Sequence, residues 1–88
     1  MTRDEAYRAA RRLLRTAKDL DIRATEAFYA TAIAEARYNL AIEFEPTLAM
    51  DVYATWQQWR KVAAELRRDA AGAQRRYDKM VAQYGLRV

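Results

Sequence analysis

The side chains of this 88-residue chain best suited to chemistry are arginines and lysines that recur at helical spacing. One basic stripe consists of Arg8, Arg11, Arg15 and Lys18, and a second consists of Lys61, Arg68, Arg75 and Lys79. Guanidinium groups make paired contacts with phosphate oxygens, so these stripes suit nonspecific nucleic-acid binding. The expected phosphate contacts are Arg8, Arg11, Arg15, Arg68 and Arg75. Interspersed Asp and Glu residues also fit a simpler hypothesis, in which the stripes are solvated helix faces with i,i+4 ion pairs.

Catalytic residue types are scarce in the chain. It contains neither histidine nor cysteine, so the commonest general base and the thiol nucleophile are missing. Glu26, Glu35 and Glu43 cannot form the Glu-x-x-His metal site of helical bundles, and no glycine-rich phosphate loop occurs. We therefore expect no enzymatic activity, no metal and no cofactor. An arginine-lined pocket that acts on an anionic substrate by electrostatics alone is the one enzymatic alternative.

Both basic stripes lie within longer apolar patterns of helical period. In the C-terminal half, apolar residues alternate at steps of three and four over about five heptads. This second seam consists of Ala49, Val52, Trp56, Trp59, Ala63, Leu66, Ala70, Ala73, Tyr77, Met80 and Tyr84. Such a pattern predicts a helix that lies along a partner helix in a left-handed supercoil.

A similar pattern of three and four fills the N-terminal half and is rich in alanine. This first seam consists of Ala6, Ala10, Leu13, Ala17, Leu20, Ala24, Ala27, Thr31, Ala34, Tyr38 and Ala41. Small side chains allow two helix axes to approach closely. Asp19 and Asp21 are able to cap a new helix and so to divide this one, but the seam passes through Leu20 without changing phase. One continuous helix is the favoured prediction.

The helix ends are marked by residues with known capping preferences. Thr2 and Glu5 form a capping-box pattern at the start of the chain, and Gly85 followed by Leu86 suits a left-handed C-terminal cap. Pro46, the only proline, disfavours helix at the residue before it and suits the first turn of a new helix. Gly72 lies inside the second helical pattern, either as a tolerated defect or as a point of close approach by another backbone.

These signals together predict an all-α protein with one domain, residues 1–88. We expect a first helix over about 3–44, a turn at about 45–47 and a second helix over about 47–84. A short connection makes the two helices antiparallel, so the predicted fold is a long helical hairpin with a coiled-coil-like seam.

Apolar residues outside the seams indicate that the hairpin is part of a larger helical bundle. Tyr29, Ile33, Ala36, Leu40 and Phe44 form an outer stripe that is rotated away from the first seam. A helix that is apolar on two sides is usually buried on two sides. The predicted protein interface consists of Phe28, Tyr29, Ile33, Leu40, Phe44, Tyr53, Trp56 and Trp59. The alternative is that some of these rings only cap the internal core.

Charge is divided along the chain. Six Lys or Arg face three Asp or Glu in residues 1–20, two face six in residues 21–51, and eight face three in residues 52–88. Folding at Pro46 therefore gives a rod with a basic open end and an acidic closed end, which can orient an assembly.

The function expected from the sequence is that of a non-enzymatic structural or adaptor subunit. It self-associates or docks into a larger assembly, for example a virion or a secretion particle. The alternative is a nucleic-acid-associated protein that binds phosphates through the basic open end. No signal peptide and no apolar run of about 18 residues is visible, so we expect a soluble protein, in the cytoplasm rather than secreted.

Overall fold

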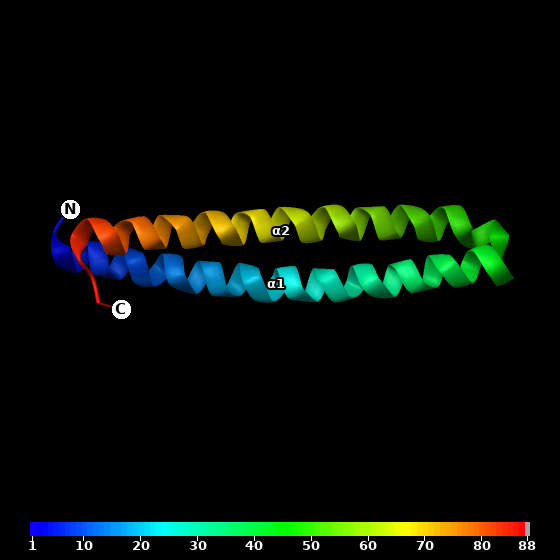
Figure 1. Ribbon diagram of the computed structural model, residues 1–88, viewed down its shortest axis with the longest axis horizontal. Coiled ribbons are helices and arrows are strands. Elements are labelled where there is room, and N and C mark those ends of the chain that lie inside the picture. Colours follow the sequence, from blue (N-terminus) through cyan, green and yellow to red (C-terminus); the bar gives the residue numbers. More distant parts are fainter. Residues whose placement is uncertain (88) are drawn as a thin grey trace.

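The computed structural model describes residues 1–87 and consists of two long antiparallel helices (Figure 1). Helix α1 spans Arg3–Phe44, a 3₁₀ turn η1 spans Pro46–Leu48, and helix α2 spans Ala49–Tyr84. The Cα trace measures 61 × 14 × 14 Å, and both ends of the chain lie at the end opposite the turn. The prediction of an all-α helical hairpin is confirmed. Val88, the last residue of the predicted domain, lies outside the described residues.

The buried residues of both helices fall on the predicted seams. All seven buried residues of α1 are alanines of the first seam, and Ala70 and Ala73 are the buried residues of α2. Trp59 also lies on the second seam, but 40% of its surface is exposed. Among residues 1–87, the buried hydrophobic core consists of nine alanines and Leu86, so the hairpin has a thin core.

Helix α1 runs through Asp19 and Asp21 without a break, which confirms the prediction of one continuous helix. The Asp21 carbonyl accepts a hydrogen bond from the Thr25 hydroxyl at 3.0 Å, one turn further along. The two aspartates therefore lie in the interior of the helix rather than at a new N-terminus.

Side chains at the open end close the hairpin as the capping pattern predicts. The Glu5 backbone N–H donates to the Thr2 hydroxyl at 3.2 Å, and that hydroxyl lies 3.2 Å from the Glu5 carboxylate. Gly85 has a positive φ of 59°, and the Leu86 N–H donates to the Val81 carbonyl at 3.1 Å. Leu86 packs onto buried Ala6 and Ala10, among partly buried Tyr7, Tyr77, Met80, Val81 and Tyr84. The Arg3 guanidinium donates to the Gly85 carbonyl at 3.1 Å and so joins the two ends of the chain.

The turn contains one element that the sequence did not predict. Residues 46–48 form the 3₁₀ turn, with the Leu48 N–H donating to the Glu45 carbonyl at 3.0 Å, and α2 begins at Ala49. Pro46 occupies the first position of this turn, where its missing N–H costs nothing. The predicted second helix, about 47–84, therefore corresponds to Thr47 and Leu48 of the 3₁₀ turn followed by α2.

Gly72 lies in the interior of α2. A Cβ atom added there would have one neighbour within 4 Å in the hairpin, the Arg75 guanidinium at 3.8 Å. Within residues 1–87, no other backbone approaches this glycine closely, so the hairpin alone supports the tolerated-defect alternative.

Candidate functional site

Large apolar side chains are exposed almost entirely in one half of the rod. Of the twelve exposed large hydrophobic residues in the described chain, eleven lie between residues 22 and 59, and the other is Met1. The eleven are Ile22, Phe28, Tyr29, Ile33, Leu40, Ile42, Phe44, Leu48, Met50, Tyr53 and Trp59. We call residues 24–66, the part nearer the turn, the closed half, and the rest of the chain the open half. Ten of the twelve therefore lie in the closed half, and Ile22 lies just outside it.

Two cavities lie next to each other along one side of the closed half. They have volumes of about 280 and 330 Å³ and share Arg37 and Val52. We call them together the closed-end groove. Its lining residues are Ala30, Ile33, Ala34, Arg37, Leu40, Ala41, Phe44, Glu45, Leu48, Val52, Thr55 and Trp59. Buried Ala34 and Ala41 lie at its base, and larger side chains from α1 and α2 form its walls.

The charges near the groove are arranged by sign. Arg37 and Glu45 are the charged residues among those that line it. Glu26 lies seven residues before Ile33 and therefore on the same line along α1. On α2, Asp51 lies one turn from Thr55 on the outer side of the groove, and Glu65 follows Asp51 by two heptads. The charged residues of these two outer lines within the closed half are therefore acidic.

An aromatic cluster occupies the opposite side of the closed half. The Tyr38 ring stacks on Trp56 at 5.5 Å between centroids and lies 5.3 Å from Tyr53. The Arg60 guanidinium lies 5.9 Å from the centre of the Trp56 ring. Trp56 Nε1 is shielded from solvent and has no hydrogen-bond partner among residues 1–87. These contacts within the hairpin fix Trp56 and leave little of it for a partner.

The eight residues predicted as an interface are not on one face. Four of them line the closed-end groove, namely Ile33, Leu40, Phe44 and Trp59. Tyr53 and Trp56 belong to the aromatic cluster. Phe28 lines a separate cavity with Arg60 and Arg67, and its ring meets that of Tyr29 edge to face at 6.0 Å. Any single partner surface therefore contacts only part of the predicted set.

Eight of the twelve lining residues were not part of the predicted interface, Leu48 and Arg37 among them. Leu48 is 47% exposed and lines the groove from the 3₁₀ turn, which the helical pattern did not reveal. Arg37 lies at the junction of the two cavities, and its position among apolar residues of the outer stripe was the available signal.

The predicted phosphate contacts lie on opposite outer surfaces of the open half. Arg8, Arg11 and Arg15 project from α1 on the side away from the first seam, whereas Arg68 and Arg75 project from α2 on the side away from the second seam. The Arg11 guanidinium donates to the Tyr7 hydroxyl at 3.3 Å, and Arg8 lies 3.5 Å from the Asp4 carbonyl. The hairpin brings the two basic stripes to one end of the rod but does not join them into one cradle.

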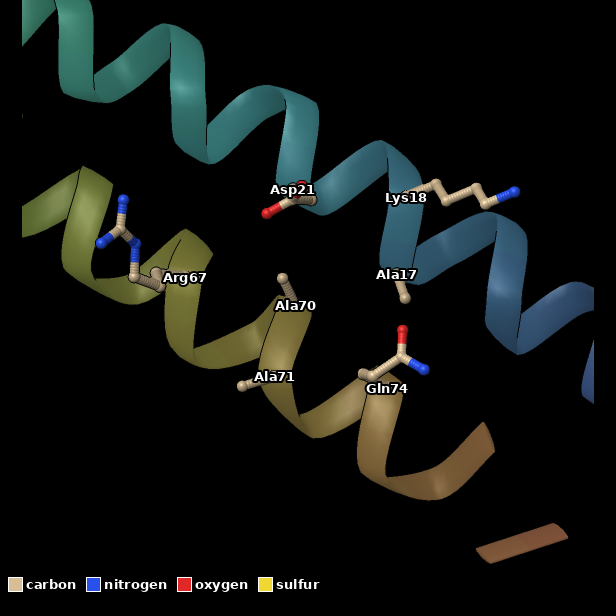
Figure 2. Close-up of a pocket in the computed structure, with 7 residues that line it drawn as sticks. All are labelled: Ala17, Lys18, Asp21, Arg67, Ala70, Ala71 and Gln74. Atoms are coloured by element: carbon tan, nitrogen blue, oxygen red, sulfur yellow. The ribbon is translucent and has the colours of Figure 1, made fainter. Parts of the chain in front are cut away.

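A cavity of about 410 Å³ lies between the helices in the open half. Figure 2 shows Ala17 pointing from α1 toward Gln74 of α2, and Ala70 pointing from α2 toward Asp21 of α1. The lining supplies one carboxylate and no nucleophile beyond the Lys18 amine.

Neither helix of residues 1–87 is long and apolar enough to cross a membrane. In the same part of the chain, no three Asp or Glu side chains are grouped so as to hold a metal ion.

Comparison with known proteins adds no relative. No protein-family model, curated protein or solved structure matches this chain.

Proposed function

We propose that this protein is a non-enzymatic helical-hairpin subunit that docks into a larger protein assembly through its closed half. A structural or adaptor component of a particle, such as a virion or a secretion machine, is the kind of role that such a rod suits. The observation that carries the proposal is the collection of eleven exposed large hydrophobic residues in the closed half and its immediate border.

The amount of exposed apolar surface supports docking. Each of these side chains exposes between 40% and 75% of its surface. At about 200 Å² for a large side chain, eleven of them present on the order of 1,000 Å² to solvent. The largest apolar patch of an ordinary monomer is about 300–600 Å², and a standard interface buries about 800 Å² per partner. The side chains are distributed around the rod, so this total is divided among several faces, and five of the eleven line the closed-end groove, namely Ile33, Leu40, Phe44, Leu48 and Trp59.

The thin core gives a second reason. Alanine contributes one methyl group, so nine buried alanines and Leu86 remove little apolar area from water. A chain of this size with a small core is marginally stable on its own, so further burial would stabilise it. Docking of the closed half supplies that burial.

The test is the double variant Ile33→Glu with Leu40→Glu, which places charge on the groove wall. Its control is Thr25→Glu with Ala32→Glu, which adds the same charge at the same spacing on exposed positions of α1 outside the groove. Molar mass by light scattering, at low and moderate salt, and recovery of the partner from the native source are compared with wild type. We expect the groove variant to lose the assembly and the control to keep it. Wild-type mass and wild-type partner binding in the groove variant would contradict the proposal.

A second candidate function is supported by the charge of the open half. That half carries thirteen Lys or Arg against six Asp or Glu, a net charge of +7, whereas the closed half has −3. Binding of duplex or single-stranded nucleic acid through one basic stripe should weaken steeply with salt. Absence of measurable binding at about 50 mM salt would remove this candidate.

A further inference from the structure

We propose that the closed-end groove receives one amphipathic α-helix with basic flanks from a different protein. This inference rests on the proposed docking function and specifies the partner at one face. It follows from the size of the groove, the shape of its base and the sign of the surrounding charges.

The length of the groove matches a short helix. Its α1 wall extends from Ala30 to Phe44, and the fourteen steps of 1.5 Å between them span about 21 Å, or about four helical turns. The α2 side extends from Leu48 in the turn to Trp59. A helix placed between these walls would present anchors at i, i+3, i+4 and i+7.

The shape of the groove explains why a helix fits there. Ala34 and Ala41 are 5% and 8% exposed, and their small side chains form a low base. Phe44 and Leu40 are 70% and 57% exposed, so they stand above this base as walls without a cover. Leucine-sized anchors of a third helix would fill the space over the alanines and cover the walls, as in a three-helix bundle.

The charges around the groove indicate which residues should flank the apolar stripe of the partner helix. Glu26 lies on the outer line of α1, Asp51 and Glu65 lie on the outer line of α2, and Glu45 lies at the closed end. Lys or Arg residues beside the apolar stripe of a partner helix would lie opposite these carboxylates. Arg37 is the cation among the lining residues, and one acceptor on the partner would pair with it.

Neither half of a second copy of this chain combines an apolar surface with basic charge. Its closed half is apolar but acidic, with a net charge of −3, so two closed halves repel. Its open half is basic, but Met1 is the one exposed large hydrophobic residue that the described chain has outside residues 22–59. Charge and apolar surface coincide only in a partner of different sequence.

The experiment uses two synthetic peptides of about 18 residues, enough for four to five turns. Both carry leucines at i, i+3, i+4 and i+7 and lack tryptophan. One has lysines on the flanks and the other has glutamates at the same positions. The full chain with Trp56→Phe keeps Trp59 as its single tryptophan, and Trp59 lines the groove. We expect a blue shift of Trp59 emission with the lysine peptide and at least tenfold weaker binding of the glutamate peptide.

Two variants of that reporter chain locate the binding. Ile33→Glu with Leu40→Glu should weaken the lysine peptide at least tenfold despite the added negative charge. Thr25→Glu with Ala32→Glu should leave its affinity within twofold. Equal affinity for both peptides, or unchanged affinity in the groove variant, would overturn the inference.

Self-association gives a third outcome. A wild-type dimer that the groove variant converts to a monomer would show that the occupant is a second copy, and it would overturn the proposal of a different protein. Failure of both peptides, with the native assembly still lost in the groove variant, would refute the helical basic partner and leave the docking function standing.

Discussion

Substitution of Gly72 by alanine should stabilise the hairpin. Gly72 lies in the interior of α2 with a helical backbone, and the new Cβ would have one neighbour within 4 Å, the Arg75 guanidinium at 3.8 Å. That separation is ordinary van der Waals contact. Glycine costs about 0.5–1 kcal/mol relative to alanine inside a helix, because its backbone loses more freedom on folding. We therefore expect the free energy of unfolding to rise by about 0.5–1 kcal/mol.

The assay is urea and thermal unfolding followed by circular dichroism at 222 nm. For a domain of 60–100 residues, 1 kcal/mol shifts Tm by about 4–8 °C, so the expected increase is about 2–8 °C. The matched control is Ala71→Gly at the exposed neighbouring position, which should lower Tm by a similar amount.

Two results would refute this reasoning in different ways. A loss of stability at a protein concentration where the chain is monomeric would mean that the added methyl group is not accommodated within the hairpin. A loss that appears only at concentrations where the chain associates would place another backbone against Gly72, which is the alternative that the hairpin alone does not support.

Three further substitutions test the ends and the middle of the rod by the same unfolding assay. Thr2→Ala removes the hydroxyl that caps α1 and should lower stability by about 1 kcal/mol, and no change would mean that this cap is frayed in solution. Leu86→Ala truncates the largest buried side chain of the cluster at the open end and should cost about 2 kcal/mol or more, with faster amide exchange in the last turn of α2 as a second readout. Ala10→Leu overpacks a fully buried position and should cost about 1–3 kcal/mol, whereas Ala32→Leu at an exposed position should change little; equal effects would contradict the close approach of the helices.

The hairpin was predictable because its signals are local or strictly periodic. The spacing of three and four passes through Asp19 and Asp21 unchanged, so one helix is the simplest interpretation of α1. Thr2 and Gly85 satisfy backbone groups within their own turn, so their roles do not depend on tertiary structure.

The side of the hairpin on which each apolar residue of the closed half lies was not predictable in the same way. Phe28 and Ile33 are both exposed on α1, but only Ile33 lines the groove, because the pairing of α1 with α2 decides which flank each residue occupies. Trp59 lies on the second seam, yet Ala30 and Ala34 across from it in the groove are too small to cover an indole ring. Exposure at that position is set by the residues of the other helix.

The alanine seam has a consequence for how firmly one helix is fixed lengthwise against the other. Alanine recurs at steps of three, four or seven along much of the middle of α1, so sliding α2 by a heptad would often replace one methyl contact with another. The alignment is instead set near the two ends. Leu86 packs on Ala6 and Ala10 at one end, and Tyr38 packs with Tyr53 and Trp56 toward the other. The short turn Pro46–Leu48 also joins the helices covalently and holds their register at the closed end, so loss of the Leu86 contacts would loosen the open end alone.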